Sequence, residues 1–264
     1  MELYPDRACP SLRSWWHGSI YSEHYIIYSH KKPNKMRKVA IFDIDGTIFR
    51  SSLVIELTDA FIQEGVFSSK IKRLYAISHK NWLDRKGPYE EYINAVVRAF
   101  RKKVKGITYK EFSKIAKKVV ALQKNRTYIY SRDLIKKLKK KGYFLLAISH
   151  SPKRIVEEFC RKLGFNKVYG QIYEIDKQKR FTGKVLYLDL IIDKAKVLKR
   201  AIEKEKLTLE GSVGVGDTES DIGFLKMVEN PICFNPNKKL YQYAKRAGWK
   251  IIVERKDVIY HISQ

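Results

Sequence analysis

Two aspartates, Asp43 and Asp45, stand two residues apart where an apolar run of the sequence ends, and Gly46 follows them. One carboxylate in such a pair can attack phosphorus, while its neighbour gives a proton to the leaving oxygen and later activates water. Crowding of two carboxylates can raise the pKa of one of them, so we expect a protonated Asp45 beside an ionised Asp43. The same spacing also occurs in calcium loops and turns, but its place at the end of a strand favours catalysis.

Two further positions could contribute to a phosphate site. Ser149 ends a second apolar run, where its hydroxyl and backbone N–H can donate to a phosphoryl oxygen. Ser151, followed by Pro152, is the better candidate for the N-cap of the next helix, which would leave Ser149 free for a ligand. Lys194 begins a later helical pattern and could bring a positive charge to the phosphoryl group, with Lys196 as its competitor.

A second acidic pair, Asp217 and Asp221, follows another apolar run. Asp217 could join Asp43 in offering oxygen ligands to Mg²⁺, which binds few protein carboxylates and keeps its other positions for water and substrate phosphate. Asp221 could orient Asp217 or Lys194 from behind. Taken alone, the pair is also typical of a helix N-terminus that carries favourable charges.

These residues need structural elements that bring them together. The run KVAIFD (38–43) is apolar and β-branched, and it predicts a buried central strand with Asp43 at its carboxyl end, where open α/β sheets bind ligands. Strand-like runs then alternate with helical patterns, which predicts an α/β fold: a three-layer α/β/α, Rossmann-like parallel sheet. The further strands are expected at 143–149, 212–216, 231–234 and 249–254, and the helices at 152–163, 191–205 and 238–247.

Two segments interrupt this alternation. In residues 51–127 the apolar positions recur at helical spacing, which predicts an inserted helical cap. The segment 173–187 alternates around a polar centre and predicts a β-hairpin that projects from the core sheet. The catalytic core is therefore expected to comprise residues 36–50 and 128–264.

Residues 1–35 form an N-terminal extension in which several Trp and Tyr residues stand among polar ones without a regular period. Two interpretations are open. Translation could begin at Met36, which would make the extension dispensable, or the extension could be an aromatic arm that packs on the core or on a partner.

The order of these motifs resembles the haloacid dehalogenase (HAD) superfamily over essentially residues 36–264. The helical insertion, together with ISHSPKRIVEEFCRKLGF, FTGKV, KAKVL and GVGDTESDIGFLKMVENPICFNP, resembles its phosphoserine-phosphatase-like branch (subfamily IB). This resemblance implies an aspartyl-phosphate on Asp43, acid and base roles for Asp45, and Mg²⁺ bound by the Asp43 carboxylate, the Asp45 carbonyl and Asp217. The expected metal-binding group is Asp43, Asp45, Asp217 and Asp221.

One departure from the branch concerns the substrate. Phosphoserine phosphatases carry a substrate-recognising Glu nine residues beyond the nucleophile, and Ser52 stands there in this chain. Phosphoserine is therefore a doubtful substrate, although the phosphatase chemistry is unaffected. The residues expected to select the leaving group are Arg50, Ser52 and Trp82, and those expected to bind substrate or phosphate are Ser149, His150, Thr47 and Arg50.

The composition limits the possible partners. With 44% hydrophobic and 31% charged residues the chain is expected to fold as a globular protein, and Cys9, Cys160 and Cys233 lack the spacing of a metal or redox site. No apolar run approaches the ~18 residues of a membrane span, so we expect a cytoplasmic protein. A net charge of +26 would attract any anion, nucleic acid included, but lysines on nearly every expected helix favour solvated helix faces.

The sequence therefore predicts a Mg²⁺-dependent phosphomonoesterase that acts on a small phosphorylated metabolite. A phosphatase acting on terminal phosphates of nucleic acid and a phosphomutase are the alternative enzymes, and a binding module with a vestigial site is the alternative without catalysis. Within the superfamily, the residue two positions beyond the nucleophile differs between reaction types, and an aspartate there, as with Asp45, resembles the pattern of phosphatases and phosphomutases rather than that of dehalogenases or transport ATPases. No pattern specifies an oligomeric state.

Overall fold

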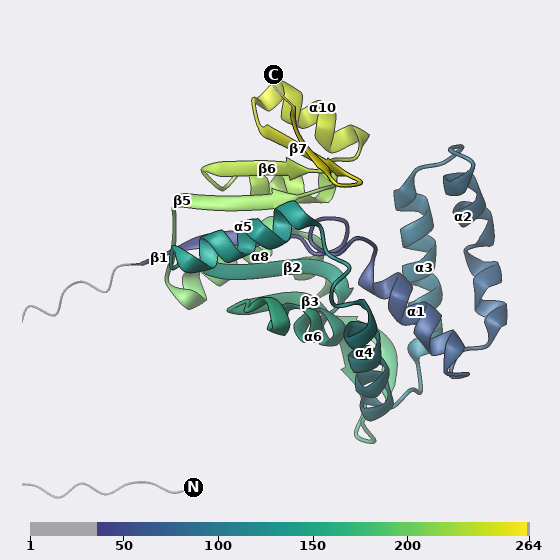
Figure 1. The fold of residues 1–264 in the computed structure, drawn as a ribbon. Helices are drawn as coiled ribbons and strands as arrows, with labels where there is room; N and C mark the ends of the chain where they lie inside the picture. The colour runs from purple at the N-terminus through teal and green to yellow at the C-terminus, as the bar shows by residue number, and fades with distance from the viewer. Residues whose placement is uncertain (1–35, 263–264) are drawn as a thin grey trace, which may run out of the picture. The chain divides into compact units, whose positions relative to one another are not determined.

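The computed structural model describes residues 36–262, so the N-terminal extension and both interpretations of it lie outside the described residues. The described part contains an eight-stranded sheet with the strand order β4-β3-β2-β1-β5-β6-β7-β8 (Figure 1). The strands are β1 (Arg37–Phe42), β2 (Phe144–Pro152), β3 (Lys167–Ile175), β4 (Phe181–Leu186), β5 (Leu207–Gly216), β6 (Asn230–Phe234), β7 (Lys250–Arg255) and β8 (Val258–Ile262).

The six central strands, from β3 to β7, pair in parallel, which confirms the expected core of the sheet. The edge strands β4 and β8 pair antiparallel with β3 and β7, so the sheet is mixed. The expected hairpin is present as β3 and β4, but its first strand also pairs with β2 and is therefore part of the main sheet. Strand β8 had no counterpart among the expected strands.

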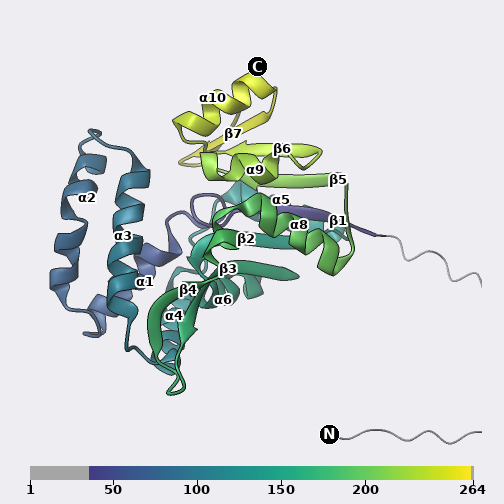
Figure 2. The same ribbon diagram turned by 180° about the vertical axis from the view of Figure 1, so that it is seen from behind.

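Helices cover both faces of the sheet. Figure 1 shows α5 (Ile129–Lys140) and α6 (Lys153–Leu163) on the near face, and Figure 2 shows α8 (Lys194–Glu205) and α9 (Ile222–Leu225) on the other. Strand β1 contributes to both cores, because Ala40 and Phe42 pack on one face while Val39 and Ile41 pack on the other. A strand buried on both faces reads as a continuous apolar run, which is why β1 was predictable. The remaining short or peripheral helices are α7 (Leu188–Ile192), η2 (Glu219–Asp221) and α10 (Lys238–Ala247).

The segment between β1 and α5 is helical, as expected, and we call residues 51–127 the helical insertion. It contains α1 (Leu53–Gln63), η1 (Ser69–Leu74), α2 (Ala76–Leu83), α3 (Tyr89–Val104) and α4 (Tyr109–Gln123). Its entering and leaving chains run side by side, because the Arg50 N–H donates to the Arg126 carbonyl at 3.0 Å and Phe49 bridges Thr127. Both views place α1, α2 and α3 beyond the carboxyl end of β1 (Figures 1 and 2).

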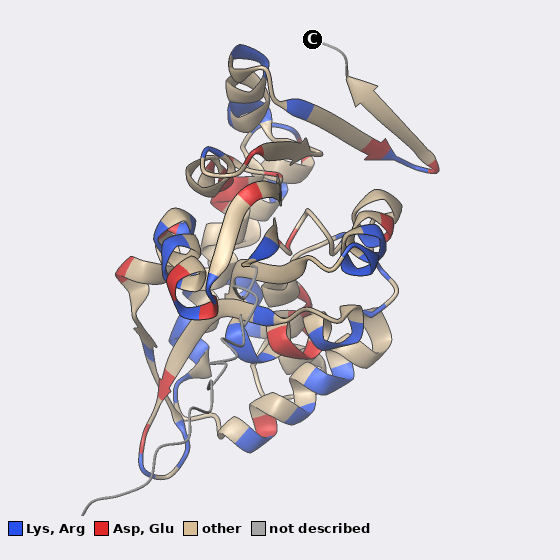
Figure 3. Ribbon diagram, turned by 90° about the vertical axis from the view of Figure 1, so that its left-hand side faces the viewer, with Lys and Arg blue, Asp and Glu red and all other residues tan. Residues whose placement is uncertain are grey.

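Positive charge is spread over many elements rather than confined to one. Figure 3 shows lysines and arginines on several separate helices, interspersed with acidic residues. Many of the ion pairs are exposed, as with Lys80 and Asp84 or Lys153 and Glu157. Among residues 36–262, no helix has both the length and the apolar character that crossing a membrane requires.

Candidate active site

The carboxyl ends of three adjacent strands, β2, β1 and β5, bring together residues that are far apart in the chain. Asp43 directly follows β1, and its N–H donates to the Val215 carbonyl of β5 at 2.9 Å. Asp217 directly follows β5, and carboxylate oxygens of Asp43, Asp217 and Asp221 all lie within 4.8 Å of one another. Asp43 of the first motif and Asp217 and Asp221 of the second therefore form one cluster.

Lys194 links two of these carboxylates. Its Nζ donates to Oδ1 of Asp43 and to Oδ1 of Asp221, each at 2.5 Å, and its side chain is 3% exposed. Lys194 begins α8 because Asp193 is the N-cap, accepting from the N–H groups of Ala195 and Lys196. The Lys196 side chain is 62% exposed and only approaches Asp193, so the structure selects Lys194 over its competitor.

The loop after β5 is held by Asp221. Its second oxygen, Oδ2, accepts from the backbone N–H groups of Asp217 and Thr218 at 2.9 and 3.0 Å. Asp221 thus fixes the backbone that carries Asp217 while its first oxygen fixes Lys194. This arrangement agrees with the orienting role that the sequence suggested for it.

Gly46 is required by the close approach of Asp217. Its φ is +81°, and a Cβ added there would lie 2.1 Å from Oδ2 of Asp217. The next residue, Thr47, is buried, and its hydroxyl donates to Oδ1 of Asp217 at 3.3 Å. The first motif therefore positions Asp217 as well as presenting its own carboxylates.

Asp45 is held by three donors. Its Oδ1 accepts from the Leu53 N–H at 2.6 Å, and its Oδ2 accepts from the hydroxyls of Ser149 and Ser151 at 2.7 and 2.8 Å. Both serines reach the same carboxylate because they are two residues apart on β2 and so point to the same side. A hydroxyl can donate or accept, so the two serines can serve Asp45 in either protonation state.

The prediction that Ser151 caps the following helix was wrong. The N-cap of α6 is Pro152, whose ring has no acceptor for a cap hydrogen bond, and the Ser151 hydroxyl donates to Asp45 instead. The prediction also left Ser149 free, whereas its hydroxyl is bound to Asp45 and accepts from the Ser151 N–H at 2.9 Å. Ser151 and Leu53 are site residues that sequence reasoning missed; a second serine at a spacing of two was the available signal.

The buried cluster carries an excess of negative charge. Burial raises the pKa of Asp43 to about 7, with Asp221 and Asp45 adding to the effect and Lys194 opposing it. Burial, Asp43 and Asp221 likewise raise the pKa of Asp217. Burial alone would lower the pKa of Lys194, but Asp221 and Asp43 outweigh it and keep the amine charged. Three carboxylates facing one ammonium therefore suit a further cation, and an all-oxygen donor set suits Mg²⁺.

His150 lies beside this cluster and is mostly buried. Burial and the neighbouring Lys194 lower its pKa to about 4, so the ring is neutral at pH 7. It hydrogen-bonds with the backbone at Ile192 and Ile191, while Nε2 has no partner among the described residues. A neutral His150 brings no positive charge to a phosphoryl group. Its backbone hydrogen bonds are instead made with the residues just before Lys194.

The three residues expected to select the substrate differ in exposure and lie in different parts of the structure. Arg50 is exposed, with its guanidinium 5.7 Å from the centre of the Tyr128 ring. Ser52 is 2% exposed at the N-cap of α1. Trp82 lies in the helical insertion, where its ring meets that of Tyr89 at 5.3 Å. Tyr89, which the sequence did not mark, is the first residue of α3, and burial together with the carboxylates of Asp45 and Asp217 raises its pKa.

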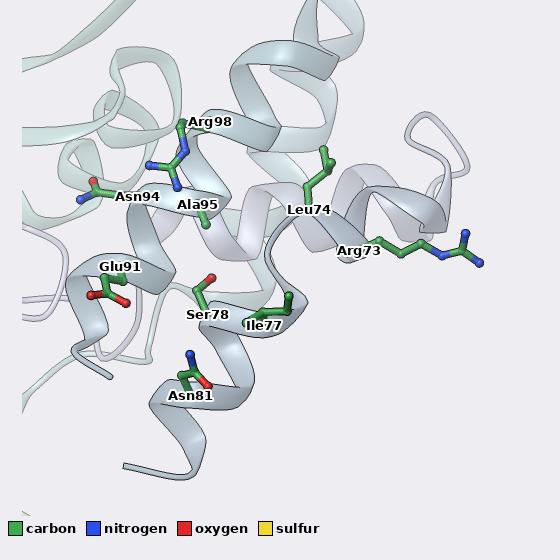
Figure 4. Close-up of a pocket in the computed structure, with 9 residues that line it drawn as sticks. All are labelled: Arg73, Leu74, Ile77, Ser78, Asn81, Glu91, Asn94, Ala95 and Arg98. Atoms are coloured by element: carbon green, nitrogen blue, oxygen red, sulfur yellow. The ribbon is translucent and has the colours of Figure 1, made fainter. Parts of the chain in front are cut away.

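A separate cavity lies within the helical insertion. It has a volume of about 480 Å³ and is bordered by α2 and α3 (Figure 4). Its polar lining includes Ser78, Asn81, Glu91 and Arg98. None of the converging residues described above lines it, so the carboxyl edge of the sheet remains the candidate active site.

Comparison with known proteins places this arrangement in context. The sequence matches the haloacid dehalogenase-like hydrolase family over residues 40–226. It is 24% identical to a phosphoserine phosphatase of Methanocaldococcus jannaschii, over 85% of this chain and 95% of the relative. It is 23% identical to an "Inhibition of morphological differentiation protein" of Streptomyces azureus, over 86% of this chain and 80% of the relative. A solved structure described as a phospho-aspartyl intermediate analogue of phosphoserine phosphatase superposes with a TM-score of 0.55 at 23% identity, covering 84% of this chain and 96% of the other, which shows a shared fold.

Proposed function

Because the chain belongs to the haloacid dehalogenase-like hydrolase family, as its motifs predicted, we propose that it is a Mg²⁺-dependent phosphomonoesterase that works through an aspartyl-phosphate on Asp43. The phosphoserine phosphatases among its relatives and structural neighbours support this reaction and the phosphoserine-phosphatase-like branch. The single observation that carries the proposal is the buried bridge in which Lys194 contacts both Asp43 and Asp221 beside Asp217.

In the first step, the free oxygen of Asp43 attacks phosphorus in line with the leaving alcohol. Lys194 holds the other oxygen of Asp43 and so fixes the direction of attack. The bond from phosphorus to the leaving oxygen breaks as the new bond forms, and the electron pair goes to the leaving oxygen. Asp45, oriented by Leu53, gives that oxygen its proton.

In the second step, Asp45 takes a proton from a water molecule, and the resulting hydroxide attacks the phosphorus of the aspartyl-phosphate. The bond to the Asp43 oxygen breaks, inorganic phosphate leaves, and Asp45 has regained its proton. The hydroxyls of Ser149 and Ser151 can follow this cycle, because each can reverse from donor to acceptor as Asp45 gains or loses its proton.

The residues that would hold Mg²⁺ are Asp43 and Asp217, with Asp221 close by. The resemblance to the family adds the Asp45 carbonyl as a ligand. When bound, the cation would offset the negative charge of the phosphoryl oxygens and of the carboxylates. The raised pKa values of Asp43, which is buried, and of Asp217, which is half-buried, are consistent with this, since the carboxylates outnumber the positive charges nearby.

The proposal is tested with a panel of small phosphomonoesters, assayed for released phosphate with and without Mg²⁺. We expect hydrolysis that requires Mg²⁺ and that is lost in Asp43→Asn, which keeps the size of the side chain but not its nucleophilic charge. Circular dichroism of the variant controls for folding. Equal rates for the wild type and a folded Asp43→Asn would rule out the proposed nucleophile.

A further inference from the structure

The helical insertion meets the core next to the candidate active site. Glu90, in the first turn of α3, lies 3.4 Å from Nζ of Lys239 on α10, and the same Nζ lies 2.6 Å from Glu219. Glu219 is two residues beyond Asp217 in the loop that follows β5. These contacts, which we call the Lys239 clasp, hold the start of α3 against the loop that carries Asp217.

Tyr89, the residue before Glu90, therefore lies at the boundary between insertion and core. Its ring meets Trp82 edge-on at 5.3 Å and Tyr92 at 6.0 Å, and Trp82 and Tyr92 stack on each other at 5.6 Å. These contacts fix the ring from the side of the insertion. About a third of Tyr89 nevertheless stays exposed, at 37%.

A second tyrosine borders the cluster from the core. Tyr128 packs edge-on against Phe234 at 4.9 Å and lies under the guanidinium of Arg50. Burial, together with the charge of Asp217, raises the pKa of Tyr128, and burial with Asp45 and Asp217 does so for Tyr89. Geometry places both tyrosines at the same loop: the N–H of Asn237, three residues after Phe234, donates to the Asp217 carbonyl at 2.8 Å, and the Lys239 clasp holds the start of α3 against that loop.

The acidic residue in the first turn of α1 is already engaged. Ser52 is buried, and Glu56, one helical turn later, accepts from Ser51 at 2.8 Å and from Arg126 at 2.7 Å. A carboxylate paired with a guanidinium has little charge left for the amino group of a phosphorylated amino acid. Glu56 is therefore occupied, whereas the rings of Tyr89 and Tyr128 offer aromatic surfaces to a substrate.

We propose that Tyr89 contacts the leaving group of the substrate, and that the preferred leaving group carries an aromatic ring that packs against Tyr89 and Tyr128. This inference rests on the proposed function, because it concerns the alcohol released by the same site. Aromatic rings attract each other edge-on or offset beyond what buried area alone gives, which is enough for a preference of about tenfold over a saturated ring.

The test compares benzyl phosphate with cyclohexylmethyl phosphate, two primary phosphomonoesters of similar size that differ in aromaticity. O-phosphoserine and glucose 6-phosphate complete the set. For the wild type with Mg²⁺ we expect kcat/KM to be about tenfold higher for benzyl phosphate than for the cyclohexyl ester. Tyr89→Leu, which keeps bulk and helix propensity, should reduce that ratio to within about twofold, whereas Tyr89→Phe should keep it.

Tyr109 offers the matched control. It also begins a helix of the insertion and is 41% exposed, but its ring contact is with Phe181 on β4. Tyr109→Leu should leave both the rates and the ratio unchanged, and circular dichroism should show all variants folded.

The inference is overturned if the wild type does not distinguish the two rings, if Tyr89→Leu keeps the preference, or if O-phosphoserine or glucose 6-phosphate is the best of the four. Each of these results would leave the phosphatase reaction itself intact. Hydrolysis of none of the four esters in the presence of Mg²⁺ would be a different failure, since it would remove the proposed function and the inference with it.

Discussion

Two lysines of this protein each bridge two carboxylates, and their surroundings differ. Lys194 joins Asp43 to Asp221 at the carboxyl edge of the sheet with 3% of its side chain exposed. Lys239 joins Glu90 of the helical insertion to Glu219 of the core with 67% of its side chain exposed. A buried bridge is costly to break on one side, whereas an exposed one is screened by water and salt. The side chains at the carboxyl edge of the sheet are therefore held in fixed positions, whereas the ion pairs between the insertion and the core can break and re-form readily.

The largest expected effect comes from breaking the buried bridge. Lys194→Met removes the charge that orients Asp43, and we expect kcat to fall by roughly 10²-fold or more. Lys196→Met, two residues along the same helix, should change kcat by less than about twofold, because that side chain is exposed. Steady-state kinetics with circular dichroism measures both. Similar losses in the two variants would mean that the buried bridge has no special role.

The second largest effect concerns the close approach of Gly46 to Asp217 at the carboxyl edge of the sheet. Gly46→Ala would push a methyl group against Asp217, so we expect Mg²⁺ affinity to fall by roughly 10-fold to 100-fold. Gly65→Ala is the control: that residue also has a positive φ, at +73°, but its Cβ would meet nothing within 4 Å. Both variants share the backbone strain, and only the first has the clash. Isothermal titration with Mg²⁺ should separate them, and equal affinities would contradict the fit of Gly46 to Asp217.

A third effect concerns protons at the edge of the sheet. Burial raises the pKa of Asp43 to about 7, so below that pH the carboxyl must lose a proton before it can bind a cation. Mg²⁺ affinity should therefore fall as pH is lowered from 8 to 6, by up to about tenfold per unit for each proton displaced. The dependence should be weaker in Asp43→Asn, which has no such proton. Affinity that does not change with pH in the wild type would exclude this competition.

The smallest effect is expected from the exposed bridge. Lys239→Gln removes the clasp between α3 and the loop after β5, and we expect KM to rise by about twofold to threefold with kcat nearly unchanged. Salt should raise KM in the wild type and have less effect in the variant, because the screened contact is already absent. A large loss of kcat would instead show that the clasp contributes to the chemical step.

The edge of the sheet was predictable because each strand there delivers its residue at a fixed place. The apolar run before Asp43 and the glycine-containing run before Asp217 mark β1 and β5, and in a parallel sheet their carboxyl ends lie at the same edge. Lys194 could be named but not separated from Lys196 by sequence, since only the cap at Asp193 decides which lysine turns inward. Ser151 was assigned to a helix cap because serine before proline suits both places.

The helices of the insertion could be predicted from the sequence, but the residues with which they contact the core could not. Helical periodicity shows which side of α3 is apolar, but not which core residue its first turn will touch. Glu90 meets the core through a residue more than a hundred positions away, Lys239, and it is this contact that brings its neighbour Tyr89 to the core. Strand β8 was missed although four of its five residues are apolar, because it is short and follows β7 after only two residues. Tertiary packing at edges and between helices leaves little local trace in a sequence.

The most direct test of the account is to find where the phosphoryl group goes. Wild-type protein is mixed with Mg²⁺ and a phosphomonoester that it hydrolyses, and the mixture is quenched in acid within the first turnover. The protein is then digested and examined by peptide mass spectrometry. We expect a phosphoryl group on the peptide that contains Asp43, labile to hydroxylamine as an acyl phosphate is, and missing in Asp43→Asn. Phosphate released with the phosphoryl group on another residue, or with no covalent intermediate at any time, would contradict the account.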